Sequence, residues 1–62
     1  MEISHSSEVR EIAELLIARY GERAASHASF QALKARNRGE PRQVEAWEHF
    51  TEAVVLAMRA EA

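Results

Sequence analysis

The side chains in this 62-residue sequence that can carry out chemistry are three histidines and ten acidic residues, all of them glutamates. Cysteine and aspartate do not occur, so the sequence holds neither a thiol nucleophile nor a Ser-His-Asp set. Gly21 and Gly39 stand far apart and do not form a phosphate-binding loop. A catalytic pocket also needs more enclosure than two helices provide. The sequence therefore predicts a protein that is not an enzyme.

The candidate metal ligands are the side chains around His49. Glu45 lies four residues before it and Glu52 three residues after it, so the three share one face of a helix. Carboxylate-bridged metal bundles instead use Glu-x-x-His pairs that point into the core, and Ala46 stands where that glutamate belongs. We interpret the group as a solvated charged face and expect no metal and no cofactor. A metal or cofactor carrier is the remote alternative.

Two polar and two aromatic side chains stand within the apolar patterns. His27 lies on the apolar stripe of the first predicted helix, where we expect it to pack at a helix interface with a hydrogen bond to a neighbour; a ligand or a pH switch is the alternative. Arg23 interrupts that stripe, either as a rim residue with a snorkelling stem or as the partner of a glutamate in a second chain. Trp47 and Phe50 have helical spacing, which favours the core or a dimer interface over a ligand pocket.

The charges are mixed along the chain. Eight basic and ten acidic residues give a formal net charge of -2, which argues against a nucleic-acid interface built on phosphate neutralisation. The longest apolar run, Ala53–Met58, is far below the roughly 20 residues that span a bilayer, and the amino terminus lacks a signal-peptide pattern. We expect no nucleic acid, no membrane and the cytoplasm as the default compartment. The basic cluster at the predicted turn is interpreted as a complement to the helix dipole rather than a phosphate site; it comprises Lys34, Arg36, Arg38 and Arg42.

Two helical segments must position these side chains, and the first begins near Ser7. Its apolar residues recur every three or four positions and fall within one arc of about 120°. They predict a helix over about residues 7–37, after a frayed lead-in over residues 1–6. The arc keeps its phase through Gly21, and one glycine in a helix costs only about 1 kcal/mol, so we favour an uninterrupted helix. The alternative is a break at Gly21 that gives a three-helix bundle.

The second segment follows a turn marked by Gly39 and Pro41. Glycine suits the carboxyl-terminal cap of one helix and proline suits the first turn of the next. Apolar residues at helical spacing then predict a second helix over about residues 41–60. So short a connection makes the helices antiparallel neighbours. The sequence thus predicts one small all-α domain over residues 1–62, folded as an antiparallel two-helix hairpin.

The two predicted helices differ in length. In an antiparallel pairing the second helix ends opposite Gly21, so the apolar residues from Val9 to Leu16 find no partner in their own chain, at roughly 1.5 to 3 kcal/mol per large side chain left in water. A chain this short, without disulfides or a metal, has oligomerisation as its remaining stabiliser. A twofold-related copy would cover the exposed stripe and form a four-helix bundle. The predicted interface comprises Val9, Ile12, Ala13, Leu16, Tyr20, Arg23, His27, Phe30, Trp47, Phe50, Val54 and Leu56.

These observations predict a non-enzymatic helical module for protein–protein interaction or regulation that self-associates as a homodimer. The alternative is a small helical binder that docks a heterologous protein through Val9–Leu16 and Leu56.

Two stretches of the sequence carry a resemblance to a known group. The first is Glu14-Leu15-Leu16-Ile17-Ala18-Arg19-Tyr20-Gly21-Glu22-Arg23-Ala24, and the second, after a glycine-containing turn, is Val44-Glu45-Ala46-Trp47 leading into Ala53-Val54. Together they resemble a group of small uncharacterised proteobacterial helical-hairpin proteins over about two thirds of the chain. The resemblance implies a bacterial source, a two-helix architecture and an open function, and it supplies no catalytic residues.

Overall fold

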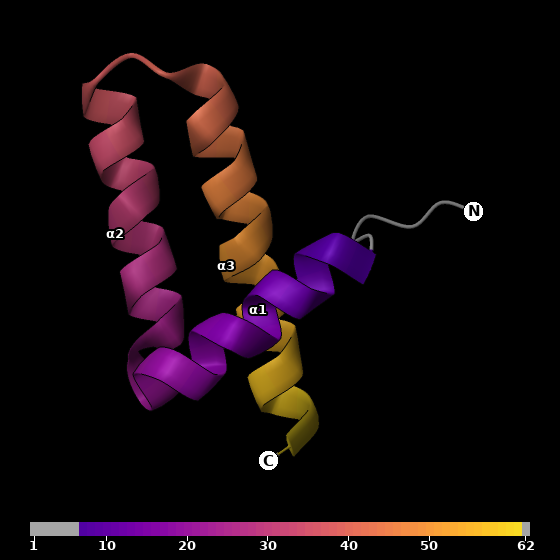
Figure 1. Ribbon diagram of the computed structural model, residues 1–62. Coiled ribbons are helices and arrows are strands. Elements are labelled where there is room, and N and C mark those ends of the chain that lie inside the picture. Colours follow the sequence, from indigo (N-terminus) through magenta and orange to yellow (C-terminus); the bar gives the residue numbers. More distant parts are fainter. Residues whose placement is uncertain (1–6, 62) are drawn as a thin grey trace.

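The computed structural model describes residues 7–61, and the predicted fraying of residues 1–6 lies outside them. The described chain is all-α, which confirms the predicted class. Its elements are α1 (Ser7–Tyr20), the 3₁₀ turn η1 (Gly21–Arg23), α2 (Ala24–Asn37) and α3 (Pro41–Glu61). α2 and α3 lie side by side as an antiparallel hairpin, and α1 crosses over α3 (Figure 1).

The predicted antiparallel hairpin is confirmed for α2 and α3, together with its turn. Gly39 has φ +71°, and its N–H donates to the Arg36 carbonyl at 3.1 Å, while the Glu40 N–H donates to the Ala35 carbonyl at 3.0 Å. These two bonds form a Schellman cap, which satisfies the last carbonyls of α2. α3 then starts at Pro41, where the missing N–H has no helical partner to lose.

The uninterrupted first helix predicted over residues 7–37 is wrong, and the alternative break at Gly21 is what the structure contains. Gly21 has φ +59°, a left-handed conformation open to glycine and strained for other residues. The chain turns there through η1, so that α1 leaves the line of α2 and packs against α3 (Figure 1). Helix propensity through this region is good, but tertiary packing outweighs it.

The break also overturns the argument from unequal helix lengths. Ala13 is 1% exposed, and Val9 and Leu16 are partly buried against the cluster formed by Ala13, Ala24, Ala53 and Val54. The segment expected to lack a partner therefore finds one in α3 of its own chain. A straight helix over residues 7–37 would project past α3, whereas the bend at Gly21 turns α1 back onto α3.

The core consists of small side chains. Among the described residues, the buried apolar positions are six alanines and one valine, Val54. Small residues at a helix contact let the axes approach closely, because the distance between helices depends on the side chains between them. The alanines lie on the inward faces of all three helices: Ala13, Ala24, Ala28, Ala32, Ala35 and Ala53.

No helix within residues 7–61 combines the length and apolar character needed to cross a bilayer.

Candidate functional site

Four rings predicted as interface residues meet within one chain. Tyr20 at the end of α1 stacks on His27 of α2, with ring centroids 4.0 Å apart and planes at 17°. His27 and Trp47 form a T-shaped pair with centroids 6.0 Å apart, and Trp47 and Phe50 form another at 5.4 Å. Such pairs contribute about 0.5 to 1.5 kcal/mol each beyond area burial. The break at Gly21 brings the first pair together, so this row is packing along the edge of the core.

The row corrects one detail of the sequence analysis. His27 was expected to make a hydrogen bond to a neighbour, but its contacts within the described chain are with rings. Arg23 lies exposed in η1, beside Tyr20, Ser26 and His27, in the manner of a rim residue.

The metal candidate around His49 does not assemble. Among the described residues, no group of three or more histidine, cysteine, aspartate or glutamate side chains lies close enough to hold a metal ion. His49 is half-buried, and Glu45 and Glu52 are exposed along α3.

Half of the predicted basic cluster pairs with glutamates of the same chain. The Arg36 guanidinium donates to the Glu48 carboxylate at 3.1 Å, and the Arg38 guanidinium donates to Glu40 at 3.2 Å. The Lys34 ammonium lies 5.3 Å from the centre of the Phe30 ring, within cation–π range. Much of the positive charge of this cluster therefore already interacts with groups of the same chain.

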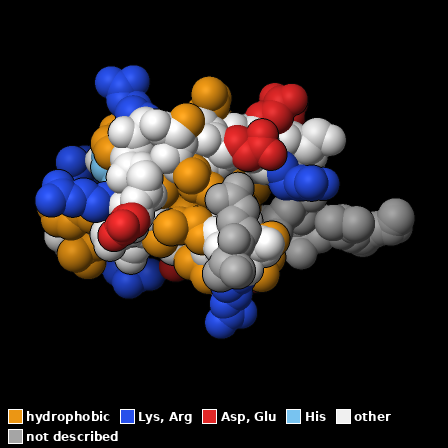
Figure 2. Space-filling view, turned by 90° about the horizontal axis from the view of Figure 1, so that it is seen from below, with side chains coloured by type: hydrophobic (Ala, Val, Ile, Leu, Met, Phe, Trp, Pro, Cys, Tyr) orange, Lys and Arg blue, Asp and Glu red, His pale blue; other side chains and the backbone are white. Residues whose placement is uncertain are grey.

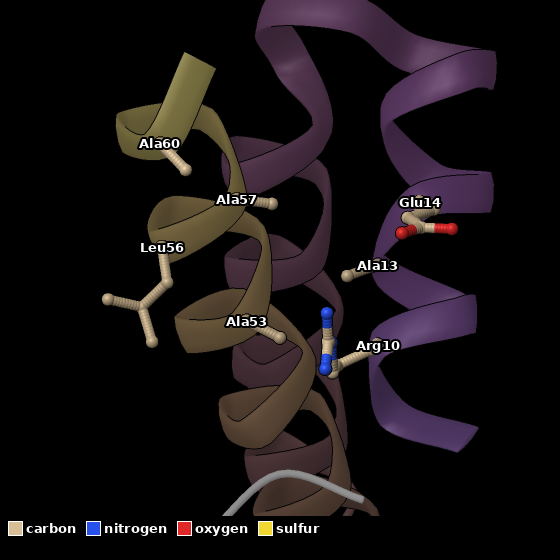
Figure 3. Close-up of a pocket in the computed structure, with 7 residues that line it drawn as sticks. All are labelled: Arg10, Ala13, Glu14, Ala53, Leu56, Ala57 and Ala60. Carbon is tan, nitrogen blue, oxygen red and sulfur yellow. The ribbon is translucent and has the colours of Figure 1, made fainter. Parts of the chain in front are cut away.

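A groove lies between α1 and the second half of α3. It has a volume of about 260 Å³, and Figure 3 shows Ala13 of α1 facing Ala53 and Ala57 of α3 across it, with Leu56 pointing away. Arg10 and Glu14 form its α1 wall. The sequence did not predict this groove, although alanines at 53, 57 and 60 have the spacing of one helix face. The groove marks where α1 rests on α3.

The exposed apolar set is the second feature that the sequence analysis found only in part. Its exposed fractions run from 68% for Leu15 and 57% for Phe30 to 37% for Val55. Phe30 and Leu56 belong to the predicted interface, whereas Leu15, Leu33 and Val55 were not predicted as interface residues. Figure 2 shows one face of the molecule, seen from below, with apolar side chains near its middle and charged side chains around them. The exposed set itself is spread over α1, α2 and α3. The set comprises Leu15, Phe30, Leu33, Val55 and Leu56.

The remaining predicted interface residues are covered in their own chain to different degrees. Ala13 and Val54 are buried. Half-buried are Val9, Ile12, Leu16, Tyr20, His27, Trp47 and Phe50.

Fold and surface together define a small all-α domain in which one helix crosses an antiparallel hairpin. No family model, curated protein or solved structure matches the chain.

Proposed function

We propose that the protein is a non-enzymatic helical interaction module that associates with a second copy of itself. The observation that carries this proposal is an inverted distribution of apolar size. Within the described chain the buried positions are alanines and one valine, while a phenylalanine, three leucines and a valine are exposed.

The energies favour covering those exposed side chains. Full burial of a leucine, valine or phenylalanine stabilises a protein by about 1.5 to 3 kcal/mol, so covering one that is half exposed contributes about 1 kcal/mol. Phe30 and Leu33, which share one side of α2, therefore contribute about 2 kcal/mol per chain and about 4 kcal/mol to a symmetric dimer. A domain of this length has a total stability of roughly 3 to 9 kcal/mol. Contact with a partner is therefore comparable in size to the folding free energy itself.

The proposed association surface centres on α2. Phe30 and Leu33 are three residues apart and 57% and 48% exposed, so they form one apolar ridge on the outer side of the hairpin. The alternative is a heterologous partner docked through Val9–Leu16 and Leu56. We favour self-association, because Val9 and Leu16 pack against their own core, although Leu56 is 48% exposed.

Sedimentation equilibrium from low micromolar to millimolar protein tests the proposal. The wild-type chain should change from monomer to dimer across this range. Phe30→Ser/Leu33→Ser should weaken the dimer by about three orders of magnitude, because a symmetric dimer loses four side chains worth about 1 kcal/mol each. The single variant Leu15→Ser, on a different helix, is the control and should associate like wild type.

A wild-type chain that stays monomeric at millimolar concentration while melting cooperatively would contradict the proposal. A Leu15→Ser dimer as weak as the Phe30→Ser/Leu33→Ser dimer would contradict the placement on α2.

A further inference from the structure

α1, which packs against α3, is connected to α2 by a bend that depends on the backbone conformation of Gly21. Gly21 has φ +59°, and a Cβ built on it meets no atom within 4 Å. Neither Tyr20, before η1, nor Arg23, before α2, makes a side-chain capping hydrogen bond. The Ala24 N–H donates to the Gly21 carbonyl within the bend, and the docking of α1 and the Tyr20–His27 stack hold it in place of side-chain caps.

The sequence through the bend also suits a straight helix. Glu22, Arg23, Ala24 and Ala25 are good helix formers, and no proline stands between residues 7 and 37. In a straight helix, Ala24, His27 and Phe30 stay within the arc of the apolar residues of α1. One sequence therefore fits two backbone paths, bent with α1 on its own α3, or straight with α1 projecting.

From these observations we propose that two chains exchange α1. Gly21 straightens in each, and α1 of one copy docks on Ala53 and Val54 of the other. The proposal rests on the proposed self-association and adds the exchange of α1 to the contact through α2. A straight helix over residues 7–37 is about 46 Å long and α3 about 32 Å, so the projecting part extends past its own α3. The surface that receives it is the one α1 already covers in the closed chain, which makes the second copy a fitting occupant.

Substitution at the bend tests the exchange. Gly21→Ala penalises the left-handed conformation and favours helix, and both effects act in each of two chains. The dissociation constant of the dimer should fall by on the order of a thousandfold relative to wild type. The cause would be backbone conformation, because the added methyl group meets no neighbour in the bent form.

Gly39→Ala is the matched control. Gly39 also has a positive φ, +71°, and equally empty surroundings. Straightening there is blocked, because a helix through this point would bring the Pro41 ring against the Asn37 carbonyl. Gly39→Ala should lower the melting temperature without tightening the dimer. A chemically synthesised chain with D-alanine at position 21 should do the reverse of Gly21→Ala, because a D-residue prefers positive φ.

Cross-linking reads out which chain α1 contacts. The natural sequence has no cysteine, so Ala13→Cys and Ala53→Cys chains can be mixed, refolded together and oxidised. Arm exchange predicts a disulfide between Cys-bearing positions 13 and 53 of different chains. Ala18→Cys replaces Ala13→Cys in the control, since Ala18 is exposed on α1 away from the core, and it should give far less cross-linked dimer.

The outcomes separate the inference from the proposed function. Wild-type dimers that form without the 13–53 cross-link, and that Gly21→Ala does not strengthen, overturn arm exchange and leave self-association standing. Chains that remain monomeric with Gly21→Ala overturn both. If the cysteine variants do not fold, as judged by circular dichroism, the comparison of Gly21→Ala with Gly39→Ala decides the matter.

Discussion

Val54 is the one buried side chain larger than alanine in the described chain, and it lies where α1 and α3 meet. Val54→Ala removes two methyl groups, which lowers the free energy of unfolding by about 1.6 kcal/mol at about 0.8 kcal/mol per group. The cavity that remains adds to the loss, because neighbouring helices relax only in part. Alanine returns about 0.6 kcal/mol through its higher helix propensity. The net loss should be about 2 kcal/mol, a large part of the stability of so short a domain.

Urea unfolding followed by circular dichroism, at one fixed protein concentration, measures this loss. The melting temperature should fall by about 10 °C, given about 4 to 8 °C per kcal/mol for a domain of this size. Val55→Ala is the control, because this neighbouring valine is 37% exposed and its truncation loses less burial energy. The higher helix propensity of alanine offsets that loss, so we expect the free energy of unfolding to change by no more than about 0.5 kcal/mol. Equal losses at positions 54 and 55 would refute the placement of the core.

Two further predictions concern the close helix contact and the surface charges. Ala28→Leu should destabilise the protein by about 1 to 3 kcal/mol in urea unfolding, because Ala28 is fully buried on α2. Ala18→Leu is the control and should change the stability little, because Ala18 is exposed. Similar effects of the two variants would mean that the helices are not closely packed. The side chains of Arg36 and Glu48 are 63% and 58% exposed. A double-mutant cycle with alanine should therefore give a coupling free energy below about 1 kcal/mol, which added salt weakens. A larger coupling that does not depend on salt would contradict a solvated ion pair.

Local signals were enough to predict much of the fold. Gly39 and Pro41 predicted the turn between α2 and α3, because each residue has a backbone preference that acts wherever it stands. Helical geometry also turns Leu56, two positions after Val54, toward the opposite side of the helix, and the structure leaves it 48% exposed while Val54 is buried. Both inferences depend on positions close in sequence, where helical geometry fixes the relation.

The candidate site was less predictable, because it depends on which helix covers which. Helical spacing identified four aromatic side chains as interface residues: Tyr20, His27, Trp47 and Phe50. It did not predict that they meet as a row of rings within one chain. Leu15 and Leu33 were missed, because a stripe pattern identifies the inward face and says little about large residues outside it.

The sequence by itself determined an all-α chain, the ends of its hairpin and the inward side of each helix, since helix caps and apolar spacing act over a few residues. Only the tertiary structure decided the path at Gly21. A glycine in a good helix-forming context fits either a straight helix or a left-handed turn, with a difference of about 1 kcal/mol. The free energy gained when α1 docks on Ala53 and Val54, more than thirty residues after Gly21, is large enough to choose between them.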